Sequence, residues 1–283
     1  MSHIPDRVPG PLAGASPDWP ALAVRDISLS FGGIRALQDV SFQVAPAEIR
    51  AVIGPNGAGK SSLVNVICGL YRPQAGRVQL GPDSFARIAP QHLARLGLAR
   101  TFQNLALFPA LSVRQNIAAG RVFRARSGLV AQVLGLPAAR AEIRASETAV
   151  EDTAALLGLT PILERRVEGL PYGLRKQVEL ARAVIAQPRI LLLDEPMAGL
   201  TVTEKAAMAR QIRALRDRLG VAVILIEHDI GIVMGLSDRV AVLDHGLLIA
   251  DGTPDQVRRD PEVIRAYLGA DAAGDAANET EAA

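Results

Sequence analysis

Residues 54–62 read Gly54-Pro55-Asn56-Gly57-Ala58-Gly59-Lys60-Ser61-Ser62. This run matches the phosphate-binding loop, in which a glycine and four further residues precede Gly-Lys-Ser or Gly-Lys-Thr. The apolar residues 49–53 before it are typical of a buried parallel strand, and residues 62–67 after it are typical of an opening helix. The alternative is a glycine-rich turn with an exposed lysine, which does not require a strand before it and a helix after it. We therefore interpret residues 54–62 as a phosphate loop.

The chemistry of such a loop needs these residue types. Glycines allow the backbone N–H groups to surround an oxyanion, and the N-terminus of the following helix adds partial positive charge. Lys60 would reach the β- and γ-phosphates, and the Ser61 hydroxyl would ligate Mg²⁺. The stretch predicts binding of ATP or GTP together with Mg²⁺.

The overall composition favours a parallel sheet flanked by helices. Hydrophobic residues make up 49% of the 283 residues and aromatic residues only 4%, so the core must consist mostly of Leu, Val, Ile and Ala. The formal net charge of +2 is too small to argue for a nucleic-acid partner. The single Cys68 excludes an intrachain disulfide and a cysteine-based zinc cluster.

The ends of the chain predict no membrane segment. No apolar run approaches the about 18 residues that cross a bilayer, and the N-terminus lacks the apolar core of a signal peptide. Residues 1–21 form a proline-rich leader and residues 270–283 an Ala/Asp/Glu tail, and we expect both to be disordered. The protein is therefore expected to be cytoplasmic, with any membrane role arising through a partner.

The pattern along residues 22–186 changes from strand to helix. Residues 22–31 and 36–44 alternate apolar and polar side chains around Gly32-Gly33, which predicts an antiparallel hairpin. Residues 76–80 predict another strand and residues 90–97 a helix. From about 113 to 170 the sequence is Ala- and Arg-rich and helical in pattern, which indicates a helical subdomain inserted into an α/β core over about 104–186.

Two later apolar strands end in polar side chains. Residues 190–193 are followed by Asp194 and Glu195, and residues 221–226 are followed at a short distance by His228. Because ligands of open α/β sheets bind outside the carboxyl ends of the strands, these side chains are candidates for one site. The alternatives are a salt-bridged strand end and a structural histidine. Short strands near 240–243 and 247–250 and a helix over 261–268 complete the pattern.

Together these motifs resemble the ATP-binding subunit of an ABC transporter, over about residues 22–269. The resemblance includes Gln103 and the signature segment, Leu170-Pro171-Tyr172-Gly173-Leu174. It implies an α/β fold, with a P-loop NTPase (RecA-like) core, an antiparallel β subdomain and an inserted helical subdomain.

Within that superfamily, several segments look like the importers of branched-chain amino acids. The C-terminal segment, about 244–269, ends in Ile264-Arg265-Ala266-Tyr267-Leu268-Gly269 and is the most telling. The others are Ser30-Phe31-Gly32-Gly33, Arg100-Thr101-Phe102-Gln103-Asn104 and Ile226-Glu227-His228-Asp229. The long helical insertion resembles the larger of that importer's two ATPases.

The resemblance implies a role for each candidate residue. Phe31 would stack on adenine, although by pattern alone it is equally a core aromatic. Asp194 would hold Mg²⁺ directly or through water, and Glu195 would be the general base for the water that attacks the γ-phosphate. Gln103 would meet both Mg²⁺ and that water. His228 would contact the γ-phosphate and hold the water and Glu195 in place.

The signature segment departs from the usual Leu-Ser-Gly-Gly-Gln. Pro171 offers a phosphate neither a hydroxyl nor an N–H, but it suits the first turn of a helix expected over 175–186. Tyr172 and Gly173 would still face a nucleotide through the amides at that helix N-terminus. Thr201 is a milder departure, because the family usually has Asn or Asp there.

The resemblance implies an ATPase that pairs with a second, smaller ATPase or with a copy of itself. The pair would act with permease subunits and, indirectly, an external solute-binding protein, on the inner face of the cell membrane. Three rivals remain: an exporter ATPase of the lipopolysaccharide type, a soluble ABC protein of translation or DNA repair, and a nucleotide-binding scaffold without catalysis. The C-terminal segment argues against the first, the single cassette without a long coiled coil against the second, and Glu195 with His228 against the third.

Overall fold

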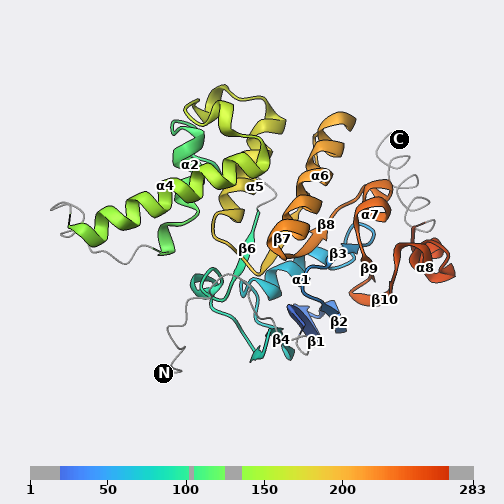
Figure 1. The fold of residues 1–283 in the computed structure, drawn as a ribbon. Coiled ribbons are helices and arrows are strands. Elements are labelled where there is room, and N and C mark those ends of the chain that lie inside the picture. The colour runs from blue at the N-terminus through green and yellow to red at the C-terminus, as the bar shows by residue number, and fades with distance from the viewer. Residues whose placement is uncertain (1–19, 102–104, 125–135, 268–283) are drawn as a thin grey trace.

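A computed structural model describes residues 20–101, 105–124 and 136–267. The predicted tail and almost all of the predicted leader lie outside these residues, as does Gln103. Two sheets and a group of helices make up the described chain (Figure 1). The predicted limits of the helical subdomain stay a prediction.

The larger sheet has six strands in the order β10-β9-β3-β8-β7-β6. Their bounds are β3 Ile49–Ile53, β6 Leu98–Arg100, β7 Ile190–Asp194, β8 Ala222–Ile226, β9 Arg239–Asp244 and β10 Leu247–Gly252. Neighbours pair in parallel except β10, which runs antiparallel to β9. Every residue of β3, β7 and β8 is buried, as expected for the centre of a parallel sheet covered on both faces.

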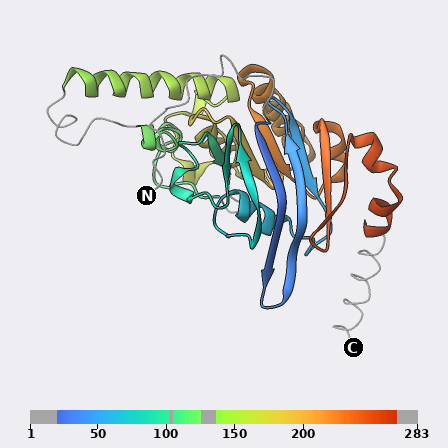
Figure 2. The same ribbon diagram turned by 90° about the horizontal axis from the view of Figure 1, so that it is seen from below.

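The smaller sheet is antiparallel, in the order β2-β1-β4-β5. Its strands are β1 Leu22–Phe31, β2 Ile34–Val44, β4 Ala75–Leu80 and β5 Asp83–Phe85. Figure 2 shows β1 and β2, in two shades of blue, side by side as a long hairpin. The hairpin predicted around Gly32-Gly33 is present, since Phe31 pairs with Ile34 across that turn.

The described chain contains α-helices and short 3₁₀ turns, and two sets of the helices lie on different sides of the sheets. The α-helices are α1 Lys60–Ile67, α2 Val113–Ala119, α4 Pro137–Leu157, α5 Tyr172–Val184, α6 Val202–Leu219, α7 Ile230–Leu236 and α8 Pro254–Arg258, and residues 261–267 are also helical. Short 3₁₀ turns cover Pro90–His92, Val122–Arg124, Thr160–Ile162 and Val167–Gly169. Helices α2, α4 and α5 lie together on one side, away from the antiparallel strands, whereas α7 and α8 lie beside β9 and β10 (Figure 1). In the part of the chain that is described, no helix is both long enough and apolar enough to cross a membrane.

The side-chain alternation of β7 explains how one sheet supports two cores. Ile190 and Leu192 join a cluster with α1 and the antiparallel sheet, whereas Leu191 and Leu193 join a cluster with α2, α4, α5 and α6. Successive side chains of a strand point to opposite faces, so a single strand contributes to both layers. This two-layered α/β core, with an antiparallel sheet and a helical region, confirms the predicted fold class.

The bounds of two helices differ from those predicted from the sequence pattern. The predicted helix over 90–97 is only the 3₁₀ turn Pro90–His92, and the chain then turns through Gly97, whose φ is +83°.

Helix α5 begins at Tyr172 rather than at 175, with Pro171 immediately before it. Thr201 precedes α6, and its side chain accepts a hydrogen bond from the Glu204 amide. Thr, Asn and Asp all cap helices in this way, which explains that departure.

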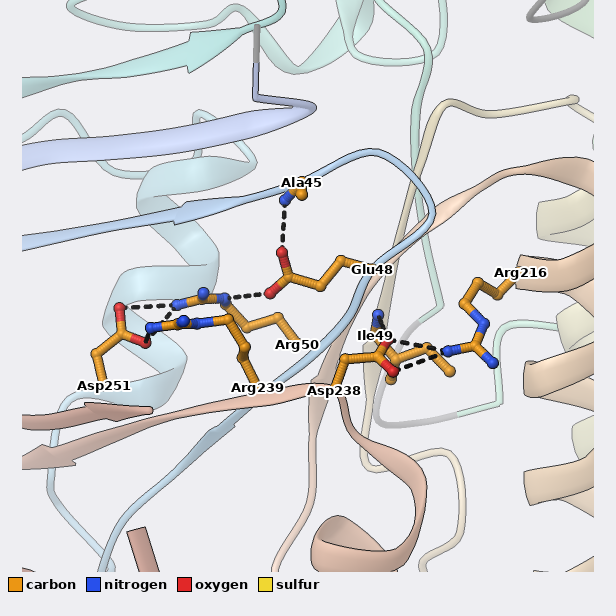
Figure 3. Close-up of polar contacts among 8 residues, drawn as sticks. All are labelled: Ala45, Glu48, Ile49, Arg50, Arg216, Asp238, Arg239 and Asp251. Carbon is orange, nitrogen blue, oxygen red and sulfur yellow. Dashed lines mark hydrogen bonds and ion pairs between the residues drawn. The ribbon is translucent and has the colours of Figure 1, made fainter. Parts of the chain in front are cut away.

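A charged group ties the phosphate-loop strand to the C-terminal strands (Figure 3). Arg50 of β3 is 2% exposed; its Nε donates to Glu48 Oε1 at 2.8 Å and its Nη1 to Asp251 Oδ1 at 2.9 Å. Arg239 of β9 donates to the same Asp251 oxygen at 3.0 Å. Nearby, Asp238 accepts from the Ile49 amide at 2.8 Å. A buried guanidinium needs both carboxylates, so Asp251 is essential to the group.

Asp251→Asn should lower the free energy of unfolding by about 2 kcal/mol, because it leaves the buried Arg50 with one carboxylate instead of two. Urea unfolding monitored by circular dichroism measures the change. Asp255→Asn is the matched control, since the Asp255 side chain is 78% exposed in a 3.6 Å pair with Arg258 and surface pairs contribute little. Equal unfolding midpoints for the two variants would contradict a structural role for Asp251.

Candidate active site

The phosphate loop follows β3 and leads into α1, as predicted. Gly54 has a φ of +152°, and a Cβ placed there would lie 2.0 Å from the Leu243 carbonyl oxygen. Gly59, which precedes α1, has a φ of +102°, and its Cβ would lie 2.6 Å from the Ala36 carbonyl oxygen. Only glycine fits at these two positions, because β9 and β2 approach the loop so closely.

Lys60 is folded back over its own loop. Its Nζ donates to the carbonyl oxygen of Gly54 at 2.6 Å and to that of Pro55 at 2.9 Å. Burial lowers the pKa of Lys60, and the nearby charge of Glu195 opposes this shift. The remaining loop positions differ in exposure: Asn56, Gly57 and Ser61 are exposed, Ser62 is half-buried and Ala58 is buried. The tip of the loop is therefore exposed to solvent, while the ammonium group of Lys60 lies inside the loop, against its carbonyl oxygens.

Glu195 and His228 come together from the ends of β7 and β8. His228 Nε2 lies 2.6 Å from Glu195 Oε1. Glu195 has a φ of +49°, a left-handed conformation that is strained for a residue with a side chain. Its amide donates to the Ile226 carbonyl oxygen at 3.0 Å, and Lys176 Nζ donates to its carbonyl oxygen at 3.4 Å. The strained turn is thus fixed by hydrogen bonds to β8 and α5.

Asp194 is held by Arg100, a residue for which the sequence analysis predicted no role. Arg100 Nη2 donates to Asp194 Oδ2 at 2.8 Å, and Arg100 Nη1 donates to Asn65 Oδ1 on α1 at 3.3 Å. The Asp194 amide donates to the Thr101 hydroxyl at 3.3 Å. Arg100 and Thr101 belong to the same run as Gln103, with Phe102 between them and the glutamine, and membership of that run was the only sequence signal for them. The ion pair joins β6, β7 and α1 at one end of the sheet.

Glu227 is a second residue whose function the sequence did not predict. It is 4% exposed and accepts a hydrogen bond from the Met197 amide at 2.8 Å. Burial raises the pKa of its carboxyl group, against the effect of its backbone hydrogen bonds. The only sequence feature that could have indicated a role for Glu227 was its position between an apolar strand and His228. Glu227 links the turn after Glu195 to the turn that carries the histidine.

Phe31 lies at the end of β1, next to a second aromatic residue. Phe31 is 45% exposed, and its ring meets the Tyr71 ring edge to face, with centroids 5.1 Å apart and an interplanar angle of 72°. Tyr71 follows α1, and its amide donates to the Asn65 carbonyl oxygen. The exposed ring offers a flat face to a planar ligand, and the role of Phe31 as that platform stays a prediction.

The signature segment opens α5 beside the turn that follows Glu195. A Cβ on Gly173 would lie 2.2 Å from Glu204 Oε1, and a Cβ on Gly199 would lie 3.1 Å from the Tyr172 ring. Tyr172 is 40% exposed, and the ammonium group of Lys176 lies 5.9 Å from its ring centroid. Tyr172 and Gly173 thus pack on residues 199–204 of their own chain, with the tyrosine ring open to solvent.

The structure therefore assembles most of the predicted residues at one sheet edge. It brings Lys60 within electrostatic range of Glu195, pairs Glu195 with His228, and joins Asp194 to α1 through Arg100. Gln103 lies outside the described residues. This arrangement has the groups for phosphate binding and for accepting a proton from water.

Two family models match the chain. The model of the ABC transporter family matches residues 37–198, which include the phosphate loop, the signature segment, Asp194 and Glu195. A second model, described as a branched-chain amino acid ATP-binding cassette transporter, matches residues 248–273.

Curated relatives and solved structures match over most of the chain. The high-affinity branched-chain amino acid transport ATP-binding protein LivG of Escherichia coli is 39% identical over 253 residues, which cover 88% of this chain and 98% of LivG. BraF of Pseudomonas aeruginosa, which bears the same description, is 37% identical with the same coverage. The ADP conformation of MJ1267, an ATP-binding cassette of an ABC transporter, superposes with a TM-score of 0.76 at 30% identity, covering 88% of this chain and 99% of MJ1267.

Proposed function

Because this chain belongs to the ABC transporter family, as one of its ATP-hydrolysing subunits, we propose that it powers an importer of branched-chain amino acids or related small polar solutes. The observation that carries the catalytic part is the 2.6 Å contact between Glu195 and His228 beside the phosphate loop. The match of residues 248–273 and the LivG and BraF relatives support the importer type over an exporter.

The phosphate loop binds the nucleotide in this proposal. Phosphate oxygens are charged acceptors and form stronger hydrogen bonds with an ammonium group than neutral carbonyls do. Lys60 therefore exchanges the Gly54 and Pro55 carbonyls for the β- and γ-phosphates when ATP arrives. The loop amides and the N-terminus of α1 bind the same phosphates, and Phe31 stacks on the adenine.

The residues beside the loop fit Mg²⁺. Ser61 is exposed at the start of α1, and Asp194 is linked to α1 through Arg100 and Asn65. A hydroxyl and a carboxylate are hard oxygen donors, which Mg²⁺ prefers, and the ion commonly completes its shell with water and substrate phosphates. Ser61 and Asp194 would hold the ion, with Gln103 as the further ligand, and the ion supplies charge neutralisation at the phosphates.

Glu195 acts as the general base. Its carboxylate takes a proton from the attacking water as the water oxygen bonds to the γ-phosphorus, and the bond from that phosphorus to the ADP oxygen breaks. His228 donates through Nε2–H to Glu195 Oε1, which fixes the direction of the carboxylate. This assignment gives the histidine the tautomer with the proton on Nε2. The products are ADP and inorganic phosphate.

The site is completed by another subunit. Tyr172 packs on residues 199–204 of its own chain and is 40% exposed, so its free surface is available to a nucleotide held by a partner, whereas Gly173 is buried beside Glu204. The partner is a second ABC ATPase or a second copy of this chain. The pair lies on the cytoplasmic face of the membrane, bound to permease subunits that receive solute from an external binding protein. No nucleic acid takes part.

The isolated chain should be a weak ATPase whose specific activity falls on dilution. Each site needs two subunits, so activity depends on the fraction of dimer, and it should rise sharply with the second ATPase and the permeases in nanodiscs. Phosphate release over a dilution series, with and without these partners, measures this. A further rise on adding a leucine-loaded binding protein tests the importer assignment. Activity independent of dilution and unchanged by permeases would overturn the transporter function.

A further inference from the structure

Three consecutive residues at the end of β8 hold the turn that carries Glu195. The Ile226 carbonyl oxygen accepts from the Glu195 amide at 3.0 Å, and His228 Nε2 lies 2.6 Å from Glu195 Oε1. Between these two residues, Glu227 Oε1 accepts from the Met197 amide at 2.8 Å. The backbone of Glu195, its side chain and the backbone two residues further on are therefore all fixed from one short stretch of chain.

The contact between Glu227 and Met197 is buried. Glu227 is 4% exposed and Met197 is 1% exposed. The Met197 side chain packs in the same apolar cluster as Leu193 of β7 and Leu225 of β8. A buried amide that loses its acceptor costs free energy, because water cannot easily take the acceptor's place. The hydrogen bond from Met197 to Glu227 thus binds the turn firmly to the end of β8.

The backbone of Glu195 requires such a restraint. Its φ of +49° is strained for a residue with a side chain, and strained conformations persist only where the surrounding contacts fix them. The Ala198 amide donates to the Glu195 carbonyl oxygen at 3.2 Å, which closes the turn around Met197. A fixed Met197 amide therefore limits movement of the peptide units that set the direction of the Glu195 side chain.

We propose that Glu227 is a positioning residue for the general base, because its carboxyl oxygen holds the turn in which Glu195 meets His228. The inference rests on the function proposed above, in which Glu195 takes the proton from water. The role requires a hydrogen-bond acceptor at position 227 and not a negative charge. Neither Glu227 nor Met197 belongs to the phosphate loop, so the effect falls on the chemical step and not on nucleotide binding.

Glu227→Met and Glu227→Gln test the proposal, because both keep the length of the side chain and only glutamine retains a strong acceptor. In a single turnover, Glu227→Met should hydrolyse bound ATP about ten to a hundred times more slowly, as expected when a buried hydrogen bond is lost and the base is slightly misplaced. Its Kd for Mg-ATP should not change. Glu227→Gln should keep the wild-type rate. Glu262→Met is the matched control, since the Glu262 side chain is 63% exposed in a 3.9 Å pair with Arg265.

The imidazole of His228 gives a readout besides activity. In the nucleotide-free wild type, at a pH at which the ring is neutral, ¹⁵N NMR should place the proton on Nε2, the tautomer that the contact with Glu195 selects. In Glu227→Met both tautomers should appear, and in Glu227→Gln only the first. A merely structural role for Glu227 would lower the urea unfolding midpoint and leave the tautomer and the single-turnover rate unchanged, which would overturn the proposal.

The remaining outcomes separate this inference from the proposed function. A Glu227→Met variant as fast as the wild type, beside a slow Glu195→Gln variant, would overturn the positioning role alone. A Glu227→Gln variant as slow as Glu227→Met would also overturn it, because the charge would then matter. Loss of the ATP-bound dimer in size-exclusion chromatography of Glu227→Met would assign the effect to subunit pairing and overturn it too.

If Glu227→Met does not fold, hydrogen exchange at the Met197 amide decides. The amide should exchange equally slowly in the wild type and in Glu227→Gln, and an unprotected Met197 amide in the wild type would overturn the proposal. A wild-type protein that neither binds nor hydrolyses ATP would instead overturn the proposed function.

Discussion

Glu195→Gln should bind Mg-ATP with near wild-type affinity and hydrolyse it roughly 10²–10⁴ times more slowly, the usual effect of losing a general base. The amide retains the size of the carboxylate and a hydrogen-bonding contact with His228, but it cannot take a proton from water. With hydrolysis blocked, the ATP-bound dimer should accumulate. Single-turnover phosphate release gives the rate, and size-exclusion chromatography with and without ATP gives the dimer.

The matched control is Glu168→Gln, because the Glu168 side chain is 56% exposed and pairs only loosely, at 3.7 Å, with Arg166. It should hydrolyse ATP at the wild-type rate. A Glu195→Gln variant that turned over ATP at near wild-type speed would show that Glu195 is not the base. The proton acceptor would then have to be sought elsewhere at the same sheet edge.

Lys60→Ala should abolish measurable ATP binding and leave the fold intact. The ammonium group has two backbone carbonyls as its partners and serves as the counter-charge for phosphates. Each lost charge-assisted hydrogen bond weakens binding by about 1.5–3 kcal/mol, so the Kd should rise by at least about two orders of magnitude. Fluorescence titration with a labelled ATP analogue measures the Kd, and urea unfolding verifies the fold.

Lys205→Ala removes the same charge from α6, where Lys205 pairs with Asp229 at 2.9 Å. It should reduce ATP affinity little, since Lys205 lies on α6 and not on the phosphate loop. A well-folded Lys60→Ala protein that kept micromolar affinity would remove the basis for the phosphate-loop assignment. The two variants together separate a specific contact from a general change in charge.

The sequence was sufficient to predict those features that depend on neighbouring residues in the chain or on the ends of parallel strands. The phosphate loop has its strand and helix as immediate neighbours, and Asp194, Glu195 and His228 follow apolar strands whose parallel pairing brings their ends together. The pairing of Glu195 with His228 follows from that rule, although they are 33 residues apart.

The sequence could not predict contacts that depend on side-chain reach between distant elements. Arg100 and Asp194 are 94 residues apart, and nothing in either local pattern indicates that one guanidinium would join Asp194 to α1. The prediction of a helix over 90–97 was wrong: after the 3₁₀ turn Pro90–His92 the chain forms only separate hydrogen-bonded turns, and Gly97, with its positive φ, ends them.

The left-handed backbone of Glu195 bears on how the chain can evolve. A residue with a side chain at a φ of +49° costs about 1–2 kcal/mol relative to glycine. Selection for hydrolysis must therefore maintain glutamate against a steady gain in stability from its loss. Once a paired subunit ceases to need its own base, mutation should carry this position toward Gly, Asn or Asp, the residues that tolerate this conformation best.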